Sequence, residues 1–229
     1  MKNELADASV LNGTFVREVK NRFLCEICIE GTKTLCYVPS SCRLDNLIDL
    51  EGKDVLVTPT KSKHAKVSYS LFAVVHKKNY IILNSSMANN IIIQNISSRR
   101  FSFLGKRSSI SKECIVDGYK CDIFIQDTNT LIEVKSIITT DTYAKFPSVY
   151  SIRAIEQLRA IKKHLSNGNP ATYMIVSLSP YVRKIILDQS TPFYSIFKEC
   201  VDLGMTYFGI SSKIKDQRLA IYKSIEIQL

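Results

Sequence analysis

The hydrophobic pattern changes near residue 80, and this change constrains the fold more than any other feature of the chain. Before it, short runs rich in β-branched and aromatic residues alternate with turn-forming residues, which is typical of β-strands. These runs predict about five strands, at 13–20, 22–30, 32–38, 53–59 and 66–76. A short helix is expected at 42–50, between the third strand and the fourth. This order of elements predicts a small OB-like β-barrel.

Beyond residue 80, predicted helices and strands alternate. The clearest helix lies within 148–167, where apolar residues recur every three or four positions and Gly168 and Pro170 follow. The other expected elements are a helix within 86–98, a strand at 172–179, a helix at 192–204, and strands at 205–210 and 219–228. Alternation of this kind indicates an α/β (α+β) domain. We therefore expect two domains, at 1–80 and 81–229.

The chain is strongly basic. It carries 31 Lys and Arg against 21 Asp and Glu, and the resulting formal net charge of +10 attracts polyanions. We therefore expect nucleic acid as the partner, ahead of an acidic membrane surface. The N-terminus has no continuous apolar signal segment, and Asn and Ser interrupt the apolar run at 79–93. These features predict a cytoplasmic protein that does not enter a membrane.

The seven cysteines raise the question of a zinc site. Four of them fall within eighteen residues: Cys25, Cys28, Cys36 and Cys42. Cys25 and Cys28 lie three apart on an expected strand, so their side chains point to opposite faces, and no Gly or Pro turn brings them together. We therefore expect reduced, buried thiols rather than zinc ligands or disulfides. The histidines stand among lysines, so we expect all three on the surface: His64, His76 and His164.

Residues 121–136 place charged side chains inside an otherwise apolar pair of predicted strands. If the strands are antiparallel and joined by 127–130, residue 126 faces residue 131, and Asp122 lies opposite Lys135. Phe124 then lies opposite Glu133, and because paired residues share a face, both acids and the lysine emerge on one side. The opposite face is expected to pack into the core and carries Cys121, Ile123, Ile125, Ile132 and Val134.

Two neighbouring carboxylates and a lysine suit metal-assisted hydrolysis of a phosphodiester. Asp122 and Glu133 are expected to hold Mg²⁺ or Mn²⁺, hard cations that prefer oxygen ligands and stabilise charge on phosphate. Lys135 would orient or deprotonate the attacking water, or stabilise charge in the transition state. The alternative is an ordinary surface ion pair, because Glu-x-Lys also occurs at 18–20 and 51–53. Only the copy at 133–135 follows a strand that carries an acid of matching parity.

This Asp, Glu-x-Lys arrangement resembles that of the restriction-endonuclease-like PD-(D/E)xK nucleases. Several further stretches narrow the resemblance by their order and spacing. They are NRF at 21–23, PSSCRL at 39–44, NSSMANNII at 84–92, DGYKCDIF at 117–124, IEVKS at 132–136 and AKFPSVYSIRAIEQL at 144–158. On these motifs the chain resembles the sugar fermentation stimulation protein A (SfsA) family along nearly its whole length.

The resemblance implies an N-terminal OB-like domain that binds nucleic acid, followed by a restriction-endonuclease-like α/β domain. It places Asp122, Glu133 and Lys135 at the family's catalytic positions, and the carbonyl of Val134 would complete the metal ligands. The supporting residues are expected to be Gln94, Glu113, Arg153 and Gln157. Gln94 and Gln157 depart from the family pattern, in which a glutamate and a histidine are expected. A neutral amide is a weaker metal ligand than glutamate and cannot carry a proton as histidine does.

Basic and aromatic residues of the predicted barrel are expected to contact phosphates and stack on bases. They are Arg17, Lys20, Arg22, Phe23, Arg43, Lys61, Lys63 and Lys66. We therefore expect a metal-dependent nuclease that acts on DNA or RNA. The alternative is a non-catalytic DNA-binding regulator of sugar-metabolism genes, in which the hairpin is a relic. The sequence leaves open the nucleic acid and its strandedness, and whether the chain forms a homodimer.

Overall fold

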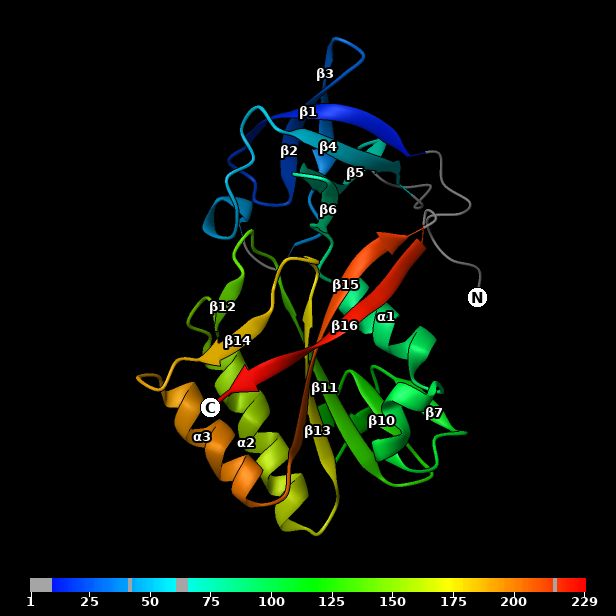
Figure 1. Ribbon diagram of the computed structural model, residues 1–229, viewed down its shortest axis with the longest axis vertical. Helices are drawn as coiled ribbons and strands as arrows, with labels where there is room; N and C mark the ends of the chain where they lie inside the picture. Colours follow the sequence, from blue (N-terminus) through cyan, green and yellow to red (C-terminus); the bar gives the residue numbers. More distant parts are fainter. Residues whose placement is uncertain (1–9, 41–42, 61–65, 216–217) are drawn as a thin grey trace.

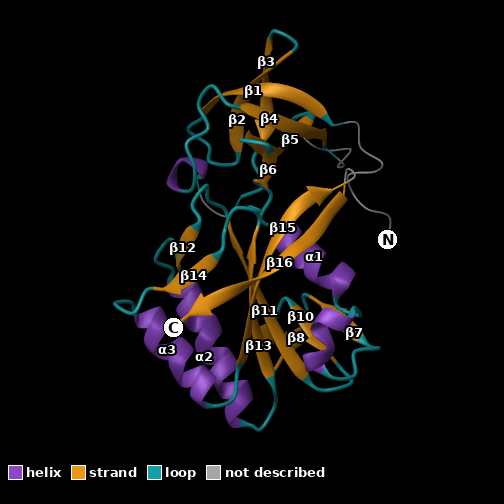
Figure 2. Cartoon of the chain, viewed as in Figure 1, coloured by secondary structure: helices purple, strands orange, loops and turns teal. Residues whose placement is uncertain are grey.

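The computed structural model describes residues 10–40, 43–60, 66–215 and 218–229 of the chain. Figures 1 and 2 show a small β-barrel at one end of the molecule and a sheet flanked by helices at the other. This arrangement confirms the expected fold class, an OB-like barrel followed by an α/β domain. Among the described residues, no helix is both long and apolar enough to cross a membrane.

The barrel is closed by five strands, with a short 3-10 helix, η1 (Leu44–Asn46), after the third. Its strands are β1 (Leu11–Glu18), β2 (Leu24–Ile29), β3 (Thr32–Tyr37), β4 (Asp54–Pro59) and β5 (Tyr69–His76). The hydrogen-bonded order is β3-β2-β1-β4-β5, and a parallel pairing of β3 with β5 closes it. Residues alternate inward and outward along β2, so that Cys25, Ile27 and Ile29 are all buried. A sixth strand, β6 (Asn79–Ile82), extends the sheet beyond β5.

The second domain is built on an eight-stranded sheet of order β12-β14-β16-β15-β13-β11-β10-β7. Its strands are β7 (Ile110–Lys112), β10 (Ile123–Ile125), β11 (Thr130–Ile137), β12 (Tyr143–Phe146), β13 (Ala171–Ser177), β14 (Lys184–Leu187), β15 (Thr206–Lys215) and β16 (Arg218–Gln228). The helices are α1 (Met87–Asn95), α2 (Ile152–Ser166), α3 (Pro192–Asp202) and the 3-10 helix η2 (Arg99–Leu104). A separate two-stranded hairpin, β8 (Ile115–Val116) and β9 (Tyr119–Lys120), precedes β10.

Strand β11 is buried on both faces. Ile132 and Val134 pack in one apolar cluster with Ile91 of α1, whereas Leu131 packs in another with Leu158 of α2. Helix α1 therefore covers one face of the sheet, while α2 and α3 cover the other (Figure 1). The three strands β11, β13 and β15 run parallel, and the central one, β13, is buried along its whole length. The face that carries Glu133 is therefore buried, as is the face that was expected to pack into the core.

The barrel and the second domain share one apolar core. The cluster on the α1 side of the sheet includes Phe15 of the barrel together with Met174 of β13. At the last residue of β6, the Ile82 N–H donates to the carbonyl of Leu178 at 3.0 Å. The hydroxyl of Tyr181 donates to the carbonyl of His76 at 2.8 Å. These contacts fix the barrel against the sheet.

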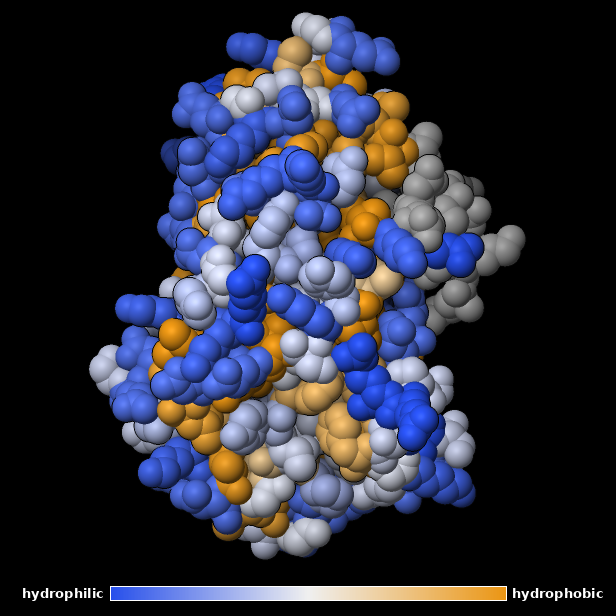
Figure 3. All heavy atoms as spheres, in the orientation of Figure 1, coloured by the Kyte–Doolittle hydropathy of each residue, from blue (hydrophilic) through white to orange (hydrophobic). Residues whose placement is uncertain are grey.

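Most of the elements that the sequence did not predict are short. Strands β6, β7, β8, β9, β12 and β14 contain only two to four residues each. A run of this length shows no clear hydrophobic period, and the pairing depends on contacts made elsewhere in the chain. Hydrophilic residues cover much of the face shown in Figure 3, in keeping with the high content of charged residues.

Gly209 of β15 lies where the backbone of β16 approaches too closely for a side chain. A Cβ at this position would lie 2.6 Å from the carbonyl oxygen of Ile225. We predict that Gly209→Ala lowers the free energy of unfolding by about 1–3 kcal/mol, because the strands must move apart. Urea denaturation provides the measurement.

The matched control is Ser211→Ala on the same strand. The Ser211 hydroxyl is buried and has no hydrogen-bond partner among the described residues, so its removal should change stability little or increase it. Equal stability of the Gly209→Ala variant and the wild type would contradict the assigned pairing of β15 with β16.

Candidate active site

The observed register of the hairpin differs by two residues from the predicted one. Ile123 pairs with Ile132 and Ile125 with Thr130, so the connecting loop is 126–129 rather than 127–130. Asn129 adopts a left-handed backbone conformation, with φ of 52°, and ends this turn. Because the shift is an even number of residues, Ile123, Ile125, Ile132 and Val134 still share one face. Cys121 was expected on that face but packs in the cluster on the α2 side, because β10 begins only at Ile123. The pairing ends at Ile123, and Asp122 reaches β11 through its side chain, which accepts a hydrogen bond from the Val134 N–H.

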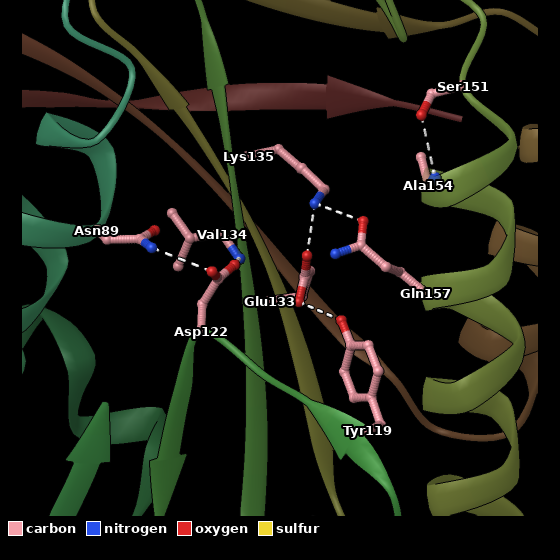
Figure 4. Close-up of polar contacts among 9 residues, drawn as sticks. All are labelled: Asn89, Tyr119, Asp122, Glu133, Val134, Lys135, Ser151, Ala154 and Gln157. Atoms are coloured by element: carbon pink, nitrogen blue, oxygen red, sulfur yellow. Dashed lines mark hydrogen bonds and ion pairs between the residues drawn. The ribbon is translucent and has the colours of Figure 1, made fainter. Parts of the chain in front are cut away.

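Glu133 is buried in the middle of β11, with 1% of its surface exposed. Its Oε1 accepts a hydrogen bond from Lys135 Nζ at 2.5 Å, and its Oε2 accepts one from the Tyr119 hydroxyl at 2.5 Å. Lys135 Nζ also donates to Gln157 Oε1 of α2 at 2.7 Å. Figure 4 shows these side chains converging between β11 and α2. The carboxylate is therefore held by donors from two different elements.

Burial governs the protonation of this cluster. It raises the pKa of Glu133 above its usual value, and the nearby Asp122 raises it further, although Lys135 acts in the opposite sense. The pKa of Tyr119 is also raised, first by burial and then by the charge of Glu133. Tyr119 is therefore a stable hydrogen-bond donor to Glu133 at neutral pH.

Asp122 lies just before β10 and is half-buried. Its Oδ2 accepts a hydrogen bond from the Val134 N–H at 2.9 Å, and its Oδ1 accepts one from Asn89 Nδ2 at 3.0 Å. Asn89 belongs to α1, on the opposite side of the site from α2 (Figure 4). The acidic pair is therefore positioned from both faces of the sheet.

The structure brings together most of the residues expected at the site. Asp122, Glu133, Lys135 and Val134 lie together, and Gln157 contacts the lysine. The contact of Val134 with Asp122 is made by its N–H. That the Val134 carbonyl binds a metal ion stays a prediction. Arg153 is exposed one helical turn before Gln157, on the same side of α2.

Two expected supporting residues lie elsewhere. Gln94 is exposed on α1, and Asn89 is the residue of that helix that contacts Asp122. Five residues of helix separate these two positions by about 140° around the axis, so they face different directions. Glu113 points away to an exposed ion pair with Lys120 at 2.7 Å, which lowers the pKa of Glu113. Only the backbone of Glu113 reaches the site, through its N–H to the Asp122 carbonyl at 2.9 Å.

Tyr119 and Asn89 are the site residues that sequence reasoning missed. Both lie inside motifs that carried the family resemblance, DGYKCDIF and NSSMANNII. The motifs indicated that these segments contribute to the site. Which of their side chains turn toward the acids depends on the packing of the β8–β9 hairpin and of α1, which the motifs do not reveal.

One histidine contradicts its expected place on the surface. His164 of α2 is 2% exposed, with Nδ1 3.2 Å from Asp117 Oδ2 and Nε2 3.2 Å from the carbonyl of Asn129. It lies seven residues after Gln157 and hence on the same face of the helix. His164 thereby joins α2 to the turns of both neighbouring hairpins. His64 lies outside the described residues.

The cysteines near the N-terminus lie mainly in the barrel core. Cys25 and Cys36 are fully buried and directly opposite each other on β2 and β3, and Cys28 is half-buried. Burial raises the pKa of Cys36 to about 11. Cys42 lies outside the described residues.

The barrel residues expected to bind nucleic acid fall into two groups. Arg17 and Arg43 are engaged within the protein, with Glu26 at 2.8 Å and Glu18 at 3.5 Å respectively. The exposed group comprises Lys20, Arg22, Phe23 and Lys66, with Arg22 stacked over the Phe23 ring at 4.6 Å. Lys61 and Lys63 lie outside the described residues.

Tyr37 is a further exposed aromatic residue in this part of the barrel. It pairs with Leu24 on the neighbouring strand, next to Phe23, and both rings are 40% exposed.

The fold and the site define a two-domain protein in which an OB-like barrel precedes an α/β domain with an acidic pair and a lysine. Models of known families agree with this description. The SfsA N-terminal OB domain matches residues 18–83, and the sugar fermentation stimulation protein RE domain matches residues 86–218. The chain belongs to the SfsA family.

Relatives with the same description cover between two thirds of the chain and nearly all of it. A sugar fermentation stimulation protein homolog of Caldanaerobacter subterraneus subsp. tengcongensis is 23% identical over 225 residues, covering 96% of this chain and 97% of that protein. A second homolog, from Thermotoga maritima, is 28% identical over 160 residues, covering 69% of this chain and 68% of that protein. The structure of Pyrococcus furiosus SfsA in complex with Ca²⁺ matches with a TM-score of 0.85 at 18% identity, covering 100% of both chains. At this identity the match shows the fold alone.

The raised pKa of Glu133 predicts a pH-dependent cost to stability. Because the folded state raises this pKa, ionising the carboxyl costs the folded state more than the unfolded state. The cost is absent below the usual glutamate pKa, grows as the pH rises toward the raised value and is complete above it. Glu133→Gln should therefore raise the melting temperature at pH ~8 in chelator, and this gain should shrink toward pH ~4.5.

Exposed Glu113 provides the control, since its pKa is lowered by Lys120. Glu113→Gln should give no gain at any pH, because its ionised form is favoured in the folded state. A loss of stability in Glu133→Gln that is equal at both pH values would mean that burial does not dominate at Glu133.

Proposed function

We propose that this protein is a divalent-metal-dependent nuclease that hydrolyses phosphodiester bonds in DNA or RNA. The observation that carries the proposal is the convergence of Asp122, Glu133 and Lys135 at one point of the sheet, with both carboxylates oriented by hydrogen bonds. The point remains accessible, because the Lys135 side chain is 24% exposed and Asp122 is half-buried. The +10 charge of the chain favours a polyanionic substrate.

The two carboxylates fit a hard cation such as Mg²⁺ or Mn²⁺. Mg²⁺ is typically held by one or two carboxylates, with waters and substrate phosphates filling its other positions, so this pair suffices. Asp122 and Glu133 each accept two hydrogen bonds, which leaves further lone pairs on their four oxygens. When bound, the ion would stabilise charge on the scissile phosphate. The Ca²⁺ of the Pyrococcus furiosus relative supports a hard-cation site in this fold.

Lys135 is the residue positioned to act on the attacking water or on the developing charge. Its ammonium group is held between Glu133 and Gln157, which fixes it near the acidic pair. Because a glutamine amide does not accept or release a proton at neutral pH, Gln157 acts by orienting the lysine. The proton transfer or charge stabilisation would then belong to Lys135 itself.

We predict that Lys135→Met lowers the single-turnover cleavage rate at saturating nucleic acid and Mg²⁺ by about a hundredfold or more. Methionine keeps the apolar stem of the side chain and removes the charge that acts in the transition state. The matched control is Lys120→Met, which removes a lysine that also pairs with a glutamate but lies on the exposed side of the hairpin. Lys120→Met should cleave at the wild-type rate. Chelator should abolish cleavage by this variant and by the wild type. Equal cleavage by the wild type and Lys135→Met would refute the proposed chemistry.

A second candidate function is a non-catalytic nucleic-acid-binding regulator. It is favoured by the observation that each oxygen of Asp122 and Glu133 already has a donor within the protein. In that case the acidic pair would be a structural network. Salt-dependent binding that is indifferent to chelator, without cleavage of any substrate tested, would support this second function.

Binding to the barrel should be separable from chemistry at the hairpin. Lys20 and Lys66 are exposed, and the double variant Lys20→Ala/Lys66→Ala should weaken binding by a similar factor for all sequences. The slope of log affinity against log salt should flatten by roughly 2, because about two phosphate contacts are lost. Lys135→Met should change this slope much less. A salt-titrated binding series measures both, and the reverse ranking of the two variants would place the binding surface at the hairpin.

A further inference from the structure

The segment 113–122 forms a tight hairpin with a cysteine on each leg. Ile115 pairs with Lys120 and Val116 with Tyr119, across a two-residue turn in which both residues have positive φ, 50° and 80°. The next pair is Cys114 and Cys121, and the Cys121 N–H donates to the Cys114 carbonyl at 3.0 Å. The Cα atoms of such a hydrogen-bonded pair lie about 5.5 Å apart, within the range that a disulfide spans.

The two sulfur atoms already touch. Cys114 Sγ and Cys121 Sγ are 3.7 Å apart, so a disulfide of about 2.05 Å requires them to approach by less than about 2 Å. Two further contacts hold the legs of the hairpin in register. The Glu113 N–H donates to the Asp122 carbonyl at 2.9 Å, and Glu113 forms an ion pair with Lys120 at 2.7 Å. Rotation of the two side chains can therefore supply most of the approach.

We propose that Cys114 and Cys121 form a reversible disulfide when the protein meets a peroxide. Cys114 is half-buried and open to a small oxidant, whereas Cys121 is buried beside it. The Cys114 thiol gives up its proton as its sulfur attacks one peroxide oxygen, and the other oxygen takes up that proton and leaves as water, which gives a sulfenic acid on Cys114. The Cys121 thiol then displaces that hydroxyl as a second water and forms the S–S bond. Two thiols are oxidised and one peroxide is reduced to two waters.

The barrel offers an internal comparison for this pair. Cys25 and Cys36 also lie directly opposite each other on paired strands, but both are fully buried. A peroxide therefore reaches Cys114 before it reaches either barrel thiol. The difference in access predicts that the Cys114–Cys121 pair is oxidised before the Cys25–Cys36 pair.

The disulfide would close a loop of eight residues that contains Tyr119 and ends just before Asp122. Tyr119 donates to Glu133, so the loop lies directly beside the candidate site. A cross-link of this kind limits local opening of the segment and stabilises the fold. The inference does not depend on nuclease activity, because the bond and its effect on stability are measured without a substrate.

The experiment treats the full chain with hydrogen peroxide, followed by an alkylating agent, and maps the peptides by mass spectrometry. We expect a loss of two hydrogens and a linked peptide pair containing Cys114 and Cys121, reversed by dithiothreitol. The melting temperature should rise by about 5 °C, and amide hydrogen exchange across 114–121 should slow by roughly tenfold. Cys114→Ser, whose fold is checked by circular dichroism, should show neither change, whereas Cys36→Ser should behave as the wild type.

Any of three results would overturn the proposal. One is oxidation of Cys114 to a sulfinic acid while Cys121 remains free. Another is a Cys25–Cys36 linkage that forms as fast as any linkage in the hairpin. The third is a linked Cys114–Cys121 peptide that appears equally in the denatured protein, with no gain in melting temperature.

Discussion

The constraint on which the rest of the second domain depends is the burial of one carboxylate in the middle of a sheet. Burying an ionised carboxyl costs several kcal/mol unless donors surround it. Glu133 receives its donors from Tyr119 of the β8–β9 hairpin and from Lys135 of its own strand. Each donor must itself be held, so the hairpin folds over the sheet and α2 brings Gln157 to the lysine. The site and the fold are therefore one network of contacts.

The barrel completes this arrangement by sharing its core with the sheet. One apolar cluster runs from the barrel strands to the side of the sheet covered by α1, and α1 carries Asn89 to Asp122. Contacts of β6 and of His76 with the segment after β13 hold the barrel in place. A surface for nucleic acid on the barrel would therefore keep a constant position relative to the acidic pair.

The sequence predicted the elements with strong periodicity and the parity of the hairpin, because these depend on local spacing. It could not predict the register, which the left-handed Asn129 and the pairing of Ile125 with Thr130 determine. It chose Gln94 on α1 where Asn89 makes the contact, since the rotation of a helix on a sheet depends on the residues that it packs against. His164 was misplaced on the surface because its partners, Asp117 and Asn129, come from turns far away in the sequence. Long-range packing explains each of these differences.

The central claim is that Asp122 and Glu133 together bind a divalent cation. Crystals of the protein soaked in Mn²⁺, with diffraction data collected at a wavelength where manganese scatters anomalously, test it most directly. The predicted result is one strong anomalous peak in contact with a carboxylate oxygen of each acid, and its loss in Glu133→Gln crystals soaked in the same way. Strong Mn²⁺ peaks elsewhere on the protein, with none between these two carboxylates, would contradict the claim.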